Sequence, residues 1–139
     1  MHVSLQQLDV RRAGVLIAVS GGPDSVALCR GLIALAEHFE LRLVIGHCNH
    51  QLRGADSAAD ATWVMELAQQ YELVGEVATL NVTEHVQRTH TSTEEAARDL
   101  RYAALIEMAE RHQCSVLALG HTADDQVETV LHHLVRGTG

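Results

Sequence analysis

The sequence contains no lysine, and its ten basic residues are all arginines. A Walker A phosphate loop needs the pattern Gly-x-x-x-x-Gly-Lys-Ser/Thr, so this chain cannot contain one. Cysteine is also scarce: Cys29, Cys48 and Cys114 are odd in number and widely spaced. Because no C-x-x-C or zinc pattern appears among them, we expect three buried, reduced thiols in a cytosolic protein.

Long apolar runs are missing as well. No stretch approaches the roughly 20 residues needed to cross a bilayer, and no apolar signal segment follows the first methionine, so we expect a cytoplasmic protein. Aromatic residues make up only 3% of the chain, which predicts a core of alanine, leucine and valine. The formal net charge of −8 is the opposite of the basic footprint usual in nucleic-acid-binding domains. If the protein nevertheless binds a nucleic acid, its contacts to the phosphates would come from local arginines or from chain beyond Gly139.

The most informative stretch of the sequence is Ser-Gly-Gly-Pro-Asp-Ser at residues 20–25. It follows the apolar run 15–19 and precedes a helical pattern over 24–38. Two glycines allow the backbone to come close to a ligand, and the start of a helix stabilises an anion through its free N–H groups. The stretch therefore predicts a phosphate-binding turn. The alternative is a tight strand-to-helix turn whose serine and aspartate serve only as helix caps.

The remaining pattern alternates short apolar runs with amphipathic segments over 139 residues, which predicts one α/β domain with a doubly wound parallel sheet of about four strands. The third strand is expected near a sheet edge, and residues 81–91 are expected to form a mobile connection near the site. Ligands of such sheets bind beyond the carboxyl ends of the strands. The stretch at 20–25, and three further stretches described below at 47–54, 94–102 and 120–129, fall at or just after those ends. Strands are predicted at 15–19, 41–47, 73–80 and 115–119, and helices at 24–38, 56–71, 92–112 and 122–135. The second strand is expected to end before Cys48 and Asn49, which would lie in the following loop. Helical spacing places Met65 on the inner face of the helix at 56–71, and Ser92-Thr-Glu-Glu95 matches a capping box.

Residues 20–25 resemble the PP-loop, S-G-G-x-D-S, of the ATP pyrophosphatase superfamily. Three further stretches, at residues 47–54, 94–102 and 120–129, together with the final Arg-Gly-Thr-Gly, resemble the tRNA(Ile)-lysidine synthetase family in content and order. The resemblance implies a Rossmann-like fold of the adenine nucleotide alpha hydrolase type. It also implies that residues 1–139 form an N-terminal PP-loop ATP pyrophosphatase domain that is incomplete at its C-terminal end.

The resemblance further implies a ligase that uses ATP and Mg²⁺. Its substrates would be tRNA(Ile) and free L-lysine: C2 of an anticodon cytidine is adenylated with release of pyrophosphate, and lysine then displaces AMP. The implied nucleotide-binding residues are Ser20, Gly21, Gly22, Pro23, Asp24, Ser25, Asn49, His50 and Gly120. The implied catalytic residues are Asp24, Asp125, Glu128 and Arg98, with Asp24 and Asp125 as ligands of Mg²⁺.

Each assignment has a simpler alternative. Asp24 could serve only as a partner of the helix dipole, and Arg98 could form a surface ion pair with Glu94. Asp125 and Glu128 could be acidic residues at the start of a helix, an interpretation that is weaker for Glu128 because it lies a turn further in. The two also share one helix face, where like charges favour a nearby cation such as Mg²⁺ or the ammonium groups of lysine.

Two other functions stay open. One is a tRNA thiolation enzyme with the same loop, although many of these need catalytic cysteine pairs that this chain lacks. The other is a non-catalytic ATP-binding module. A zinc site at His47 and His50 has no clear third and fourth ligand, so zinc is not expected.

Overall fold

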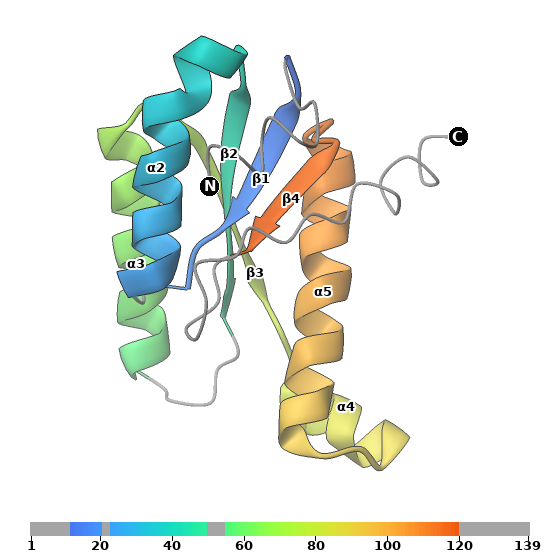
Figure 1. Cartoon of the computed structure of the whole chain (residues 1–139). Helices are drawn as coiled ribbons and strands as arrows, with labels where there is room; N and C mark the ends of the chain where they lie inside the picture. The colour runs from blue at the N-terminus through green and yellow to red at the C-terminus, as the bar shows by residue number, and fades with distance from the viewer. Residues whose placement is uncertain (1–11, 21–22, 50–54, 120–139) are drawn as a thin grey trace.

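The computed structural model describes residues 12–20, 23–49 and 55–119. Strands and helices alternate along the chain, as the sequence pattern predicts (Figure 1). The strands are β1 (Gly14–Ala18), β2 (Arg42–Asn49), β3 (Val74–Thr79) and β4 (Val116–Leu119). The helices are α2 (Pro23–Phe39), α3 (Ala55–Gln70), α4 (Val82–Thr89) and α5 (Thr93–Arg111).

The four strands of the described chain form one parallel sheet in the order β3-β2-β1-β4. The chain moves outward from β1 to β2 and β3, then returns through α4 and α5 to place β4 on the other side of β1. The order of the strands therefore reverses beside β1, and the doubly wound sheet predicted from the sequence is confirmed. Within the described residues β3 lies at an edge, as predicted.

Helices cover both faces of this sheet. Figure 1 shows α2 and α3 on one face and α5 on the other. The side chains of β1 alternate between the two layers: Val15 and Ile17 belong to the core under α2 and α3, whereas Leu16 and Ala18 belong to the core under α5. Burial on both faces explains why β1 has a continuous apolar sequence rather than an alternating one.

Three helices end in the same way, with a non-glycine residue in the left-handed region. Glu40, Glu72 and Gln113 have φ angles of 56°, 56° and 57°. In each case the next residue donates its N–H to a carbonyl five positions earlier, at 2.7–2.8 Å, which is the Schellman arrangement. The chain therefore reverses within one or two residues and feeds directly into β2, β3 and β4.

Residues 81–91, expected as a mobile connection, instead contain the helix α4. Asn81 caps it, because the Asn81 side chain accepts a hydrogen bond from the N–H of Glu84 at 3.2 Å. The apolar residue Val82 is buried against the core under α5, which holds this short polar helix to the domain. The following helix, α5, begins with the predicted capping box. The bond made by its serine is confirmed, because the Oγ of Ser92 accepts a hydrogen bond from the N–H of Glu95 at 3.1 Å.

Two finer predictions were wrong. Cys48 and Asn49 were expected in a loop after the second strand, but β2 continues through both because β3 pairs with them. Met65 was expected on the inner face of α3, yet it is 41% exposed, and Leu67 is buried in its place. The predicted helix 122–135 and the lead-in over residues 1–11 lie outside the described residues.

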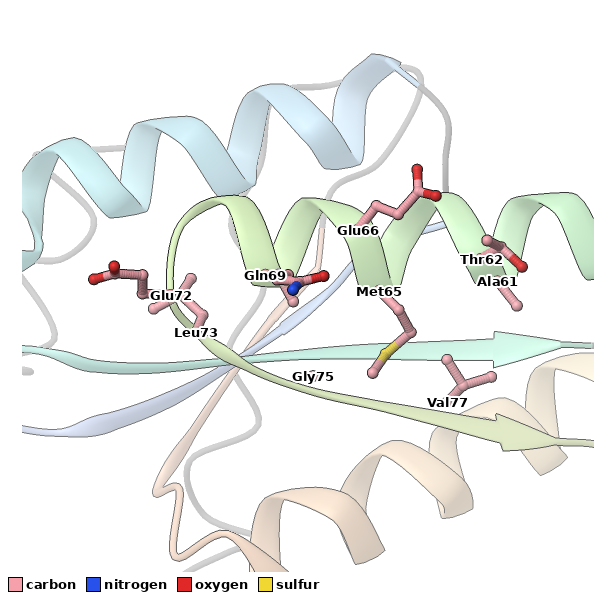
Figure 2. Close-up of a pocket in the computed structure, with 10 residues that line it drawn as sticks. Ala61, Thr62, Met65, Glu66, Gln69, Glu72, Leu73, Gly75 and Val77 are labelled. Carbon is pink, nitrogen blue, oxygen red and sulfur yellow. The ribbon is translucent and has the colours of Figure 1, made fainter.

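A groove of about 770 Å³ lies where α3 meets the exposed edge of the sheet. In Figure 2 its floor contains Gly75 and Val77 of β3, and Met65 of α3 reaches over them. Of the predicted nucleotide-site residues that the structure describes, none lines this groove. None of the helices in the described part of the chain is both long and apolar enough to cross a membrane.

Candidate functional site

The predicted phosphate-binding turn connects β1 to α2 at the point where the strand order reverses. Ser25 closes this turn at its base: its Oγ accepts a hydrogen bond from the backbone N–H of Ser20 at 3.0 Å and lies 3.1 Å from the Oγ of Ser20. Ser25 is 5% exposed, whereas Ser20 is exposed. The first and last residues of the motif are thus held together by hydrogen bonds through Ser25.

Helix α2 begins at Pro23, followed by Asp24, so the motif runs directly into a helix start. Proline suits this position because its missing N–H would have no partner inside the helix. The free N–H groups of such a first turn point toward the connecting turn and favour a bound anion. The side chain of Asp24 and residues Gly21 and Gly22 lie outside the described part of the structure.

The strand next to β1 contributes a buried histidine. His47 of β2 is 5% exposed, and its Nδ1 lies 2.7 Å from the backbone carbonyl of Val19, the residue before Ser20. Because a carbonyl can only accept, Nδ1 must be protonated and donate here. Sequence reasoning considered His47 only as a weak zinc ligand and missed this contact.

The first half of α5 lies against the carboxyl end of β2. The Sγ of Cys48 is 4.0 Å from the backbone carbonyl of Arg101. Burial raises the pKa of the Cys48 thiol to about 11, and the positive charge of Arg101 opposes this only in part. Arg101 is half-buried and Arg98 is exposed, so Arg101 is the arginine of this helix that the structure brings beside β2.

Arg98, the arginine chosen from the sequence, remains on the outer part of α5. Within residues 93–111 no ion pair joins it to Glu94, the partner that its simpler interpretation required. Asn49 is the last residue of β2 and is half-buried; its carbonyl accepts from the N–H of Leu80 at 2.8 Å. The predicted contact of Asn49 with a nucleotide stays a prediction.

Other predicted site residues lie beyond what the structure describes: His50, Gly120, Asp125 and Glu128. Among the residues that are described, no three His, Cys, Asp or Glu side chains lie close enough together to hold a metal ion. The predicted Mg²⁺ ligands, Asp24 and Asp125, are outside that search, so they also stay predictions.

These elements lie at one end of the molecule. Figure 1 shows the starts of α2 and α5 and the whole of α4 at the end of the sheet where the strands finish. Open α/β sheets bind nucleotides and other phosphate ligands beside the point where the strand order reverses, often at a helix start, and the turn closed by Ser25 lies at such a position. The fold therefore places the chain in the class of α/β domains with a doubly wound parallel sheet, and the turn is its candidate phosphate site.

Comparison with known proteins identifies the family to which this α/β domain belongs. A sequence profile of the PP-loop domain family matches residues 2–139. The chain belongs to the PP-loop domain family.

Two curated relatives share the name tRNA(Ile)-lysidine synthase. The one from Bacillus subtilis (strain 168) is 40% identical over 131 residues, which cover 94% of this chain and 28% of that protein. The one from Dehalococcoides mccartyi (strain CBDB1) is 42% identical over 125 residues, covering 90% of this chain and 26% of that protein. The chain thus spans little more than a quarter of the length of these relatives.

A solved structure, the U34-tRNA thiolase NcsA from Methanococcus maripaludis, superposes with a TM-score of 0.65 at 18% sequence identity. The superposition covers 88% of this chain and 46% of that one. At such low identity the likeness establishes a shared fold and no shared activity.

Proposed function

We propose that the chain is the ATP-binding part of a tRNA(Ile)-lysidine synthase. The observation that carries nucleotide binding is the Ser20–Ser25 turn, which Ser25 closes at the start of α2. The choice of reaction rests on the relatives, which are named tRNA(Ile)-lysidine synthase and are 40% and 42% identical across at least 90% of this chain. The proposed substrates are ATP, a tRNA(Ile) whose anticodon contains a cytidine, and free L-lysine.

The proposed chemistry has two steps. In the first, O2 of the cytidine attacks the α-phosphorus of ATP, and the bond to the bridging oxygen breaks to release pyrophosphate. In the second, the amine of lysine attacks the activated C2, AMP leaves with the oxygen, and the amine loses a proton. A carboxylate near the base is the plausible proton acceptor, and we assign Asp125 or Glu128 to this role.

The turn acts mainly on the first step. Backbone N–H groups at the start of α2 would stabilise charge on the phosphates, and they need no rearrangement because Ser25 already fixes the ends of the turn. Arg98 would contribute positive charge to the leaving pyrophosphate, and half-buried Arg101 is a second candidate.

A magnesium ion fits the donor chemistry of this motif. Mg²⁺ prefers carboxylate and phosphate oxygens, and a carboxylate without a cation would repel a pyrophosphate. Asp24 occupies the second position of α2, immediately beside the turn, so it is the residue we assign to hold the ion together with Asp125. Bound there, Mg²⁺ would neutralise charge on the phosphates.

The thiolation alternative is less well supported by the cysteines. Reactive cysteines are exposed and have a lowered pKa. Here all three cysteines are buried, and burial raises the thiol pKa of Cys29 and of Cys48 to about 11 and that of Cys114 in the same direction. Within this chain, then, no thiol has the environment of a sulfur carrier.

The decisive experiment uses the full-length protein with ATP, tRNA(Ile) and labelled lysine. We expect pyrophosphate release that depends on tRNA, and label that enters the tRNA. The Asp24→Asn variant should lose at least about 100-fold in pyrophosphate release, because the carboxylate that holds the cation is gone. An unchanged rate in Asp24→Asn would refute the role given to Asp24. Lysine label that stays out of the tRNA while sulfur enters it would identify a thiolase, and ATP binding without pyrophosphate release would identify a binding module.

A further inference from the structure

Of the described residues, two polar ones are buried, Ser25 and His47. They come from different elements, α2 and β2, yet both bind the backbone at the same place. Ser25 accepts from the N–H of Ser20, and His47 donates to the carbonyl of Val19, which belongs to the preceding residue. One junction of the chain, between Val19 and Ser20, thus receives both buried polar side chains.

This junction is where the regular sheet stops. The pairing of β1 with β2 ends at Ala18 opposite Gly46, and one more ladder bond follows, from the N–H of Val19 to the carbonyl of Gly46 at 2.9 Å. The chain must then turn away from the sheet into the phosphate turn. At this point the imidazole of His47 binds the carbonyl of Val19, so a side chain continues the contact that the backbone ladder began.

We propose that His47 is a positioning residue for the phosphate turn. By holding the carbonyl of Val19, it fixes the direction in which the chain leaves β1, and that direction sets where the N–H of Ser20 meets the Oγ of Ser25. The inference rests on the proposed function, because it concerns how the same turn binds ATP. His47 would act through the backbone and not through contact with the nucleotide.

The required donor is Nδ1–H. Both the neutral Nδ1–H tautomer and the imidazolium carry this proton, so protonation of the ring does not remove the contact. A substitute must therefore place an N–H at the position of Nδ1. The amide nitrogen of asparagine can occupy that position, whereas the longer side chain of glutamine places its amide near the position of Nε2.

The test compares His47→Asn, His47→Gln and His47→Ala in the full-length protein. For each we would measure kcat and KM for ATP in tRNA-dependent pyrophosphate release, the KM for lysine, and the thermal midpoint. His47→Ala should lower kcat/KM for ATP by about 10-fold or more, because small misplacements of positioning groups have effects of this size. In His47→Asn the kcat/KM for ATP should stay within about threefold of the wild-type value, whereas in His47→Gln it should fall further. The KM for lysine should not change in any of the three variants.

The outcomes separate the competing interpretations. The variants could instead lose catalytic efficiency equally for ATP and for lysine, in proportion to the fall in their thermal midpoint, with no recovery in His47→Asn. That result would show that His47 contributes only to general stability, and it would overturn the inference. Rescue by glutamine and not by asparagine would also overturn it, because Nε2 would then be the working atom. Should His47→Ala fail to fold, the asparagine and glutamine variants still decide between these outcomes. The proposed function is tested separately by the wild type, which must release pyrophosphate before any variant is compared.

Discussion

Gly14, the first residue of β1, gives the sharpest prediction about what holds the site's central strand in place. Its φ is not in the left-handed region, so replacing it by alanine causes no backbone strain of that kind. By the usual entropy argument Gly14→Ala should then stabilise the fold by about 0.4–1 kcal/mol, because alanine restricts the unfolded chain. We expect the opposite, and the reason is the space around the residue.

A Cβ atom at Gly14 would lie 2.8 Å from the backbone oxygen of Gln113 and would also meet the guanidinium of Arg42. That guanidinium donates to the carbonyls of His112 and Gln113 at 2.8 and 2.6 Å, so it ties the end of α5 to β2. Overpacking typically costs about 1–3 kcal/mol, and a hydrogen bond to a charged group contributes about 1.5–3 kcal/mol when it is well shielded. Because Arg42 is exposed we discount the second amount, and we expect a net loss of about 2–3 kcal/mol.

Gly46→Ala is the matched control, since Gly46 is also a buried strand glycine with no left-handed φ. Its added Cβ would lie 2.9 Å from the Sδ of Met108, the far part of a flexible side chain rather than backbone. Methionine can adjust at little cost, so we expect a loss of about 1 kcal/mol or less. The two variants add the same methyl group in the same sheet and differ mainly in what it meets.

The measurement is amide hydrogen exchange of peptides from β1 and β4 in the full-length protein. A loss of about 2–3 kcal/mol should speed exchange by roughly 30- to 150-fold in Gly14→Ala, against about fivefold or less in Gly46→Ala. Exchange in Gly14→Ala at the wild-type rate, or slower, would show that the turn after α5 yields freely and that our account of this contact is wrong.

Three other predictions concern α5, the ion pair on β3 and the thiols. Ser92→Ala removes the cap of α5 and should destabilise that helix by about 1 kcal/mol, seen as faster exchange in its first turns and not in β4. The hydrogen bond from Arg111 foremost lowers the pKa of Glu76 below its ordinary 4.5, so its ionised form stabilises the fold above that pH and the contribution disappears as the pH falls through the lowered pKa. Glu76→Gln should therefore have a lower urea midpoint than the wild type at neutral pH, with the difference shrinking below pH 4.5; a difference that grows in acid would contradict this. Burial raises the thiol pKa of Cys29 and Cys48 to about 11, so both should react with iodoacetamide far more slowly than free cysteine at pH 8, and rapid labelling of the native protein would contradict their placement.

The order and type of the elements could be predicted from the sequence because these depend on local pattern. The apolar run at 15–19 and the helical spacing after Pro23 agree with β1 and α2 to within a residue or two. The capping serine Ser92 was found because its bond reaches only three positions along the chain. The sequence missed α4, whose polar composition resembles a loop, since what holds it is the burial of Val82 against residues far away in the chain.

The candidate site divides in the same way. The turn at 20–25 and its position between strand and helix are local features, and they were predicted. The bond from His47 to the carbonyl of Val19 spans 28 positions, and the approach of Arg101 to Cys48 spans 53, so no local pattern could indicate either. The sequence pointed to Arg98 on α5, whereas the packing of α5 on the sheet brings Arg101 to β2.

By itself, then, the sequence determined which segments become strands and helices, α4 excepted, and pointed to the turn where a phosphate could be held, because hydrophobic period, glycine and helix caps act over a few residues. Only the tertiary structure decided that β4 returns beside β1, that β2 runs on through Asn49, and that a buried imidazole secures the base of the turn. Those features depend on which strands become neighbours, and that is settled by burying both faces of one sheet at the same time.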